Sequence, residues 1–290
     1  MLLTNNHTAC LGCAQIVAAR TVIDTLGANT IIVNATGCLE VTTTTYPNSA
    51  WQVPWIHSTF ANAMPVATGI KAALDYQRSQ DKKKKKQPLI LVQGGDGATF
   101  DIGFGALTAS WARGDDLFYV CYDNEGYANT GMQASLATPS QVKTPTTASS
   151  DKVTPKRDMV AIALAHQVPY VAQANIAFIE DLKNKINQAK SIKGPKYIQI
   201  LVPCLPGWKI GPADQIKAAK LATETGLYPL LEYIDGKLIK AHSLPTPTPR
   251  IEEYIELQGR YQHLRKNRSA IKTLQAVADD NIRKYNLLAE

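Results

Sequence analysis

The sequence predicts an α/β fold, a doubly wound and mainly parallel sheet followed by a C-terminal extension. Short segments rich in β-branched residues alternate with segments in which apolar residues recur every three or four positions. Strands and helices alternate in this way in βαβ units. The residues that carry chemistry follow the expected strands, where parallel sheets bind ligands. With 290 residues, 45% of them hydrophobic, the chain can bury a large core.

The individual elements follow from these two periodicities. Strands are expected over residues 30–33, 88–92, 117–122, 170–172 and 197–202. Helices are expected over residues 16–26 and 62–76, through residues 107 and 111, and over 159–166 and 176–190. Because each strand is followed by a helix, the strands should pair in parallel and be covered on both faces.

The amino-acid composition of the chain changes near Leu205. Prolines become frequent after this point, and charged helices are expected over 251–288. We therefore predict an α/β domain over residues 1–208. Residues 209–290 form an extension that packs on this domain or on a partner, and no chemistry is expected in it. The polar stretch Thr138–Ser150 is longer than most connections, which indicates a functional loop or a disordered segment.

Charge and hydropathy exclude several classes of protein. The net charge of +7 partly reflects the run Lys82–Lys86, which we interpret as a solvated loop rather than a surface for an acidic partner. No nucleic-acid partner is expected, because no aromatic residues accompany the basic ones. No stretch is apolar for 18 residues, so no membrane association is expected. Residues 1–7 lack a basic segment followed by an apolar run, which favours a cytoplasmic protein.

A possible metal and diphosphate site follows two of the strands. Gly95-Asp96-Gly97 comes directly after the strand expected over 88–92, and Asp123-Asn124 follows 25 residues later, after the next strand. A glycine turn lets backbone amides approach a diphosphate. Asp96 and Asn124 offer oxygen ligands, which together with phosphate oxygens suit Mg²⁺. The Gly-Asp-Gly triplet alone is also common in ordinary turns, but the second element at this spacing favours the site.

Five cysteines are present: Cys10, Cys13, Cys38, Cys121 and Cys204. This odd number in a chain without an apparent export signal argues against a disulfide framework. Cys10 and Cys13 form a Cys-x-x-Cys pair, and four thiolates can hold a [4Fe–4S] cluster or a structural zinc. The spacing does not decide between these. Cys121 lies inside an apolar strand and is interpreted as a buried hydrophobic residue.

The sequence motifs around these residues resemble those of a known family. The segments that carry the resemblance are Asn34-Ala35-Thr36-Gly37-Cys38-Leu39-Glu40, Pro54-Trp55-Ile56-His57-Ser58, residues 94–103 and residues 122–131. In this order they are similar to the beta subunit of pyruvate:ferredoxin oxidoreductase, the thiamine-diphosphate-binding subunit of the 2-oxoacid:ferredoxin oxidoreductases. The resemblance covers about residues 7–208. It implies a thiamine-diphosphate-binding sheet and a catalytic subunit that oxidatively decarboxylates a 2-oxoacid, most simply pyruvate, with coenzyme A.

The resemblance also implies cofactors and partners. Thiamine diphosphate would be held through Mg²⁺ by Asp96, Asn124 and the carbonyl of Gly126. A [4Fe–4S] cluster would be held by four cysteines: Cys10, Cys13, Cys38 and Cys204. Electrons would pass to ferredoxin. The subunit would work with alpha, gamma and delta-type chains, one of which supplies the carboxylate that activates the cofactor.

Further residues are candidates for the cofactor pocket. Cofactor-binding positions are Thr36, Gly37, His57, Asn62, Gly95, Asp96, Gly97, Asn124 and Gly126. Asn129 is the catalytic candidate, as a group that polarises the substrate. The sequence departs from the family at Cys13-Ala14-Gln15, where Cys-Gly-Glu is common, and this puts the substrate or the local electrostatics in question.

Three alternatives stay open. One is a related complex that acts on oxalate or another 2-oxoacid. Another is a non-oxidative thiamine-diphosphate enzyme, which would need the Asp96 and Asn124 site but no cluster. The third is a zinc-stabilised assembly subunit without enzymatic activity, which would bind metal through the cysteines and no diphosphate.

Overall fold

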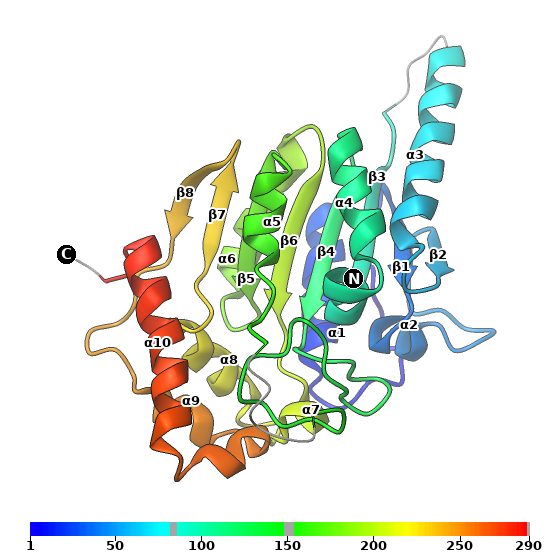
Figure 1. Ribbon diagram of the computed structural model, residues 1–290. Helices are drawn as coiled ribbons and strands as arrows, with labels where there is room; N and C mark the ends of the chain where they lie inside the picture. Colours follow the sequence, from blue (N-terminus) through cyan, green and yellow to red (C-terminus); the bar gives the residue numbers. More distant parts are fainter. Residues whose placement is uncertain (82–85, 148–153, 289–290) are drawn as a thin grey trace.

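The computed structural model describes residues 1–81, 86–147 and 154–288, and it confirms the predicted α/β class. Eight strands form one sheet in the order β2-β1-β3-β4-β6-β5-β7-β8 (Figure 1). Their bounds are β1 Thr30–Ala35, β2 Trp55–Ser58, β3 Leu89–Gly95, β4 Phe118–Asp123, β5 Tyr170–Asn175, β6 Lys196–Leu201, β7 Leu231–Ile234 and β8 Lys237–Ala241. The first six strands pair in parallel, and β7 and β8 are antiparallel.

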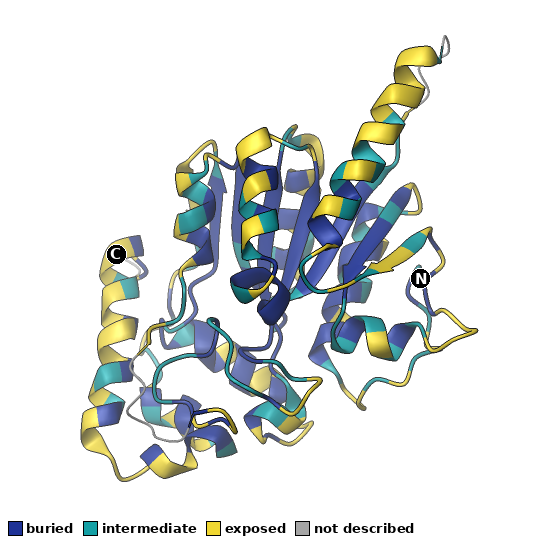
Figure 2. Ribbon diagram, turned by 45° about the vertical axis from the view of Figure 1, so that its right-hand side comes forward, coloured by how far each residue is buried: buried dark blue, intermediate teal, exposed yellow. Residues whose placement is uncertain are grey.

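Helices cover both faces of the sheet, as its apolar strands require. On one face α1 (Ala14–Leu26) packs beside α6 (Ile179–Ser191). On the other lie α3 (Ala63–Gln80), α4 (Phe104–Arg113) and α5 (Met159–Ala165), in front of the sheet in Figure 1. Figure 2 shows the strands buried between these layers, with the exposed surface on the outer side of the helices.

Side chains of β4 alternate between the two cores. Val120 and Tyr122 join the cluster under α1 and α6, whereas Tyr119 and Cys121 join the cluster under α4. The pleat of a strand produces this alternation, and both faces being covered makes both sets apolar. Cys121 is fully buried, as its apolar strand predicts.

The segment after residue 204 forms a third cluster below the sheet and also extends the sheet itself. Its helices are α7 (Leu205–Trp208), α8 (Gln215–Glu224), α9 (Ile251–Glu256), the 3-10 helix η2 (Gly259–Leu264) and α10 (Arg268–Tyr285). Residues of these helices pack around Trp208, which is fully buried. The β7–β8 hairpin adds to β5, and the end of α10 packs on the face covered by α3 to α5.

Several elements were not predicted because they are short. These are β2, α2 (Cys38–Thr43), the single π-helical turn η1 (Gly97–Asp101) and the β7–β8 hairpin. A four-residue strand shows too few alternations to be recognised from its sequence. Of the polar stretch Thr138–Ser150, residues up to 147 form turns that the Thr144 and Thr147 side chains stabilise, and residues 148–150 lie outside the described residues.

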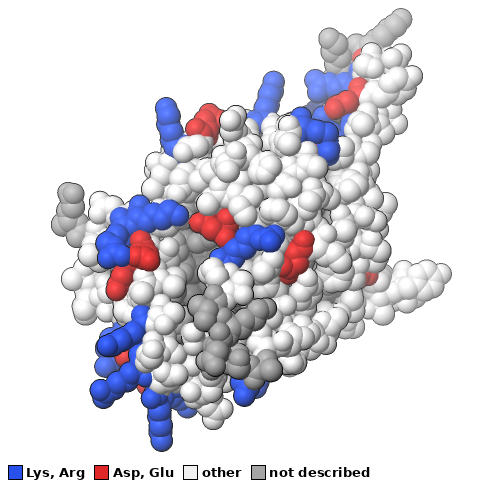
Figure 3. All heavy atoms as spheres, in the orientation of Figure 1, with Lys and Arg blue, Asp and Glu red and all other residues white. Residues whose placement is uncertain are grey.

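Most of the lysine run also lies outside the described residues, which resume at Lys86. On the face drawn in Figure 3, Lys and Arg side chains are scattered and interspersed with Asp and Glu. None of the helices in the described parts of the chain is both long and apolar enough to cross a membrane.

Truncation of Ile198, which is fully buried at the centre of β6, should lower the free energy of unfolding strongly. Ile198→Ala removes apolar contacts and leaves a cavity in a packed core, at a cost of about 2–5 kcal/mol. Ile239→Ala on the edge strand β8, where the side chain is 51% exposed, should change it by less than about 0.5 kcal/mol. Urea denaturation measures both variants, and equal losses would contradict the assignment of β6 to the core.

Candidate functional site

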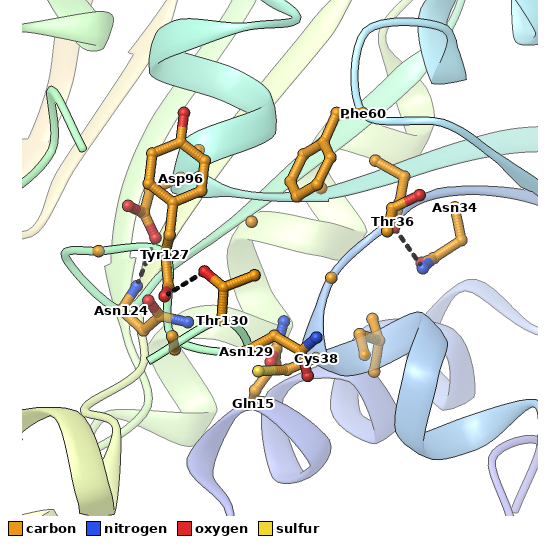
Figure 4. A pocket seen from close by; sticks show the side chains of 18 residues that line it. Gln15, Asn34, Thr36, Cys38, Phe60, Asp96, Asn124, Tyr127, Asn129 and Thr130 are labelled. Atoms are coloured by element: carbon orange, nitrogen blue, oxygen red, sulfur yellow. Dashed lines mark hydrogen bonds between the residues drawn. The ribbon is translucent and has the colours of Figure 1, made fainter. Parts of the chain in front are cut away.

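A pocket opens where β1, β3 and β4 end, and the loops after these strands line it (Figure 4). Its empty volume, including the part open to solvent, is about 600 Å³. The side chains labelled in Figure 4 are Gln15, Asn34, Thr36, Cys38, Phe60, Asp96, Asn124, Tyr127, Asn129 and Thr130. Ligands of parallel sheets bind in this position because strand ends and helix N-termini meet there.

The glycines after β3 shape the floor of this pocket. A Cβ atom on Gly97 would lie 2.3 Å from Cε1 of Tyr127, so a side chain is excluded there. A Cβ atom on Gly95 would have nothing within 4 Å, which leaves open space above its backbone. The backbone at Gly95 is therefore accessible to a bulky anionic group, as a diphosphate-binding turn requires.

The three groups predicted to hold Mg²⁺ lie together. The backbone N–H of Asn124 donates to Oδ1 of Asp96 at 3.3 Å (Figure 4). One end of the Asn124 amide faces both Oδ1 of Asp96, at 3.1 Å, and the carbonyl oxygen of Gly126, at 2.7 Å. With its nitrogen there, the amide donates to both oxygens. With its oxygen there, three acceptors converge, which a cation would stabilise; the residues therefore fit a hard cation.

Buried carboxylates surround this point. Burial and the neighbouring Asp123 raise the pKa of Asp96 well above its usual range, although the Ser135 hydroxyl donates to its Oδ2. Burial also raises the pKa of Asp123, against the effect of Lys156. Concentrated negative charge of this kind favours a bound cation and is costly without one.

Lys156 supplies one compensating charge. Its Nζ lies 2.6 Å from Oδ2 of Asp123 and 3.0 Å from Oε1 of Glu125. Burial alone would lower the pKa of Lys156, but the two carboxylates outweigh it and raise that pKa. For Glu125, burial acts to raise the pKa, but the cations Lys156 and Arg260 outweigh burial and lower this pKa below its usual range.

The four predicted cluster cysteines line a second pocket beside the first. Cys10 and Cys13 precede α1, Cys38 begins α2, and Cys204 precedes α7. The tertiary structure thus brings together thiols from three distant segments. The two pockets share the residues Gln15, Cys38, Asn124, Ala128 and Asn129.

The thiols influence one another electrostatically. Burial, followed by Cys204, Cys13 and Cys10, raises the pKa of Cys38 to about 12. Burial, with Cys13 and Cys10, also raises the pKa of Cys204 to about 11, although the backbone of Gly207 acts against it. The thiolate form of these groups is therefore disfavoured here unless a positive charge compensates it.

Within the described residues, no three His, Cys, Asp or Glu side chains are close enough to hold a single metal ion. The thiols nevertheless share one pocket, so the donor set fits an iron–sulfur cluster, whose ligands lie farther apart than those of a single ion.

The remaining predicted residues differ in where they lie. Thr36, Gly37 and Asn129 line the first pocket. His57 does not line it, but its Nε2 lies 2.7 Å from Oγ1 of Thr36. Asn62 does not line it either and is exposed just before α3.

Sequence reasoning missed several residues of the site, among them Phe60, Tyr127, Ser135 and Lys156. Phe60 and Tyr127 pack edge to face, with ring centroids 6.1 Å apart, and both line the first pocket. Tyr127 follows Gly126 directly and could have been inferred from that position. Ser135 and Lys156 carry no local signal, because the folding of the loop after β4 alone brings them to Asp96 and Asp123.

Comparison with known proteins adds to this geometry. Residues 35–200 match the model of the thiamine pyrophosphate enzyme family, C-terminal TPP binding domain. Pyruvate synthase subunit PorB of Methanocaldococcus jannaschii is 44% identical over 263 residues, 89% of this chain and 88% of PorB. PorB of Methanosarcina barkeri is 43% identical over 293 residues, 98% and 97% of the two chains.

Other similar proteins carry different names. Ketoisovalerate oxidoreductase subunit VorB of Pyrococcus furiosus is 37% identical over 291 residues, 98% of this chain and 92% of VorB. The solved structure of 2-oxoglutarate:ferredoxin oxidoreductase from Magnetococcus marinus aligns with a TM-score of 0.59 over 92% of this chain and 91% of that chain. At 20% identity, this likeness concerns the fold alone.

Asp96→Asn should separate folding from metal binding. Because the folded state disfavours the ionised Asp96, its raised pKa costs stability above the unfolded-state pKa, and this cost grows as the pH rises toward the folded-state pKa. The metal-free variant should therefore be more stable than the wild type at pH 7. Its affinity for Mg²⁺ in the presence of thiamine diphosphate should fall at least about tenfold.

Thermal denaturation and calorimetry measure the two effects, with Asp75→Asn, which removes an exposed carboxylate on α3, as the control. A metal-free variant that is less stable, or that binds Mg²⁺ as the wild type does, would contradict the assignment.

Proposed function

Because this chain belongs to the thiamine pyrophosphate enzyme family, among the PorB and VorB subunits, we propose that it is the thiamine-diphosphate-binding and cluster-carrying subunit of a 2-oxoacid:ferredoxin oxidoreductase. The resemblance seen in the sequence motifs is thereby confirmed, and so is the expectation of a subunit of a multi-subunit oxidoreductase. The observation that supports the finer proposal best is the adjacency of the two pockets, one with the Asp96 constellation and one with four cysteines.

The first pocket is the proposed cofactor site. Thiamine diphosphate supplies the carbanion-stabilising chemistry by which a 2-oxoacid loses CO₂. The turn around Gly95 would accept the diphosphate, and Asp96, Asn124 and the Gly126 carbonyl would hold Mg²⁺ against it. Thr36 and Gly37 would line the rest of the cavity. His57, which is hydrogen-bonded to the Thr36 hydroxyl, would orient that hydroxyl.

Asn129 is the proposed catalytic side chain. It is exposed and lines both pockets, so its amide can reach a substrate bound over the cofactor and polarise its carbonyl. Gln15 also lines both pockets and is buried, and in the described structure its side chain makes no hydrogen bond. A neutral amide here leaves the space between the pockets less negative than the Glu expected from the family.

The second pocket is the proposed [4Fe–4S] site, with Cys10, Cys13, Cys38 and Cys204 as ligands. A cluster bound there would accept electrons over a short path, because the pockets share residues. This adjacency favours an oxidative enzyme over a non-oxidative one.

Partner chains are proposed to complete the site. Among the described residues that line the first pocket, Asp96 carries the one carboxylate, and it is assigned to the metal. A second carboxylate to activate the cofactor would then come from an alpha-type subunit, with gamma and delta-type subunits and ferredoxin as the electron path. Pyruvate is the proposed substrate, with coenzyme A as acyl acceptor. The names of the similar proteins keep ketoisovalerate as an alternative, and oxalate stays open.

The purified chain should not turn over a 2-oxoacid alone, because the described residues that line its pocket offer no carboxylate besides Asp96 for cofactor activation. The complex with its partner subunits should reduce a viologen dye in the presence of coenzyme A. A panel of pyruvate, ketoisovalerate, 2-oxoglutarate and oxalate should give the highest kcat/KM for pyruvate. Turnover by the single chain, or a preference for another acid, would refute the corresponding part of the proposal.

Anaerobically purified protein should be brown and contain about four irons per chain. Cys38→Ser should lose most of this iron, because it replaces one of the four proposed thiolate ligands, and all three others act electrostatically on Cys38. Cys121→Ala removes a cysteine that is buried in β4 and should keep the iron. Metal analysis with absorption spectroscopy tests both variants, and bound zinc without iron would favour the assembly subunit instead.

A further inference from the structure

The backbone at Glu125 is held in an unfavourable conformation between two of the proposed metal ligands. Glu125 has a φ of 66° in the left-handed region, which a non-glycine residue adopts only where its surroundings enforce it. The residue is buried, with 4% of its surface exposed. It directly links Asn124 and Gly126, and one end of the Asn124 amide lies 2.7 Å from the Gly126 carbonyl oxygen.

Arg260 contacts this residue from the C-terminal extension. Its Nη2 lies 2.7 Å from Oε2 of Glu125, and its own side chain is 1% exposed. Arg260 belongs to η2, 135 positions away in the chain. The other carboxylate oxygen of Glu125 is bound by Lys156, so the two cations hold the carboxylate from both sides.

Neighbours fix the guanidinium group in turn. Its Nε donates to Oε1 of Gln258 at 2.8 Å, and its centre lies 3.6 Å from the ring centroid of Trp208. The indole N–H of Trp208 donates to the carbonyl oxygen of Asn124 at 2.9 Å. The stacked pair of Arg260 and Trp208 therefore holds two successive residues of the loop, one by its side chain and one by its backbone.

This buried ion pair has an unfavourable desolvation free energy. Burial removes both charged groups from water, and their mutual attraction must offset this desolvation penalty. The buried Nη1 of Arg260 in addition has no hydrogen-bond partner in the described structure. A well-packed apolar pair at positions 125 and 260 could fill the same space without this desolvation penalty. The cost is understandable if the charge maintains the geometry of the loop.

We propose that Arg260 is a positioning residue for the magnesium–diphosphate site, acting through Glu125 and, with Trp208, through Asn124. The proposal rests on the proposed function. According to this proposal, the C-terminal extension, in which no chemistry was predicted, determines the orientation of Asn124 and Gly126. It thereby determines the affinity for Mg²⁺.

The direction in which the Mg²⁺ affinity changes when Arg260 is replaced distinguishes this role from two simpler ones. Removal of a cation near a metal site should strengthen Mg²⁺ binding if Arg260 acts by through-space charge alone. If Arg260 only stabilises the fold, its removal should lower the melting temperature and leave Mg²⁺ binding unchanged. A positioning role predicts weaker Mg²⁺ binding, because the loop relaxes away from its left-handed conformation.

The experiment uses the complete complex, freed of thiamine diphosphate, and measures cofactor binding by calorimetry as Mg²⁺ is varied. Arg260→Met should raise the half-saturating Mg²⁺ concentration at least about tenfold, and Arg260→Lys, which keeps the charge, should raise it less. Lys185→Met is the matched control. It removes a buried cation with 1% of its side chain exposed, paired to Asp181 in α6, and should lower stability without changing the Mg²⁺ requirement.

Glu125→Gln tests the same contact from the other side, and Arg260→Lys, which keeps the charge, covers the case in which Arg260→Met does not fold. The effect of Glu125→Gln should not add to that of Arg260→Lys, because both variants disturb one interaction. An unchanged or lower Mg²⁺ requirement in the foldable variants would overturn the positioning role while the proposed function stands. A wild-type complex that binds no thiamine diphosphate would overturn both.

Discussion

The parallel pairing of β1, β3, β4 and β6 is the constraint on which the site depends. In register, Gly95 lies beside Tyr122, and Asp123 lies beside Leu201, so these strands end at one edge of the sheet. Each carboxyl end then contributes one short loop: Thr36 to Cys38 from β1, Gly95 to Gly97 from β3, Asn124 to Gly126 from β4, and Cys204 after β6. Antiparallel pairing would place half of these loops at the opposite edge, and neither pocket would form.

Charge balance is the second condition at this edge. Asp96, Asp123 and Glu125 are all buried, and three carboxylates within so small a volume cannot all ionise without compensation. Lys156 and Arg260 compensate Asp123 and Glu125, which leaves Asp96 as the carboxylate whose charge has no ion-pair partner in the described structure. The electrostatics thus single out Asp96 as the group that a metal ion would complete. They also explain why the C-terminal extension must pack against the loop after β4.

The two pockets lie side by side because α1 begins directly after Cys13 and places Gln15, its second residue, in the lining of both. Helix packing against the sheet fixes this position: Ile16, Ala19 and Ile23 are buried in the core under α1. The same helix therefore places a thiol in one pocket and an amide at the boundary with the other. Groups bound in the two pockets would therefore lie next to one another.

The sequence by itself determined the α/β class, the main strands and the residues at their ends, because periodicity and strand-end motifs are local properties of the chain. It also indicated the family, which whole motifs in a fixed order identify. The sequence could not show that His57 and Asn62 lie outside the lining of the pocket. Nor could it predict the contacts that Ser135, Lys156 and Arg260 make with the site. Their distances in sequence from Asp96, Asp123 and Glu125 carry no pattern, and only the packing of the long loop after β4 and of the extension brings them together. Burial then decided which charges need a partner, since the cost of a charge depends on the surrounding protein and not on its neighbours in sequence.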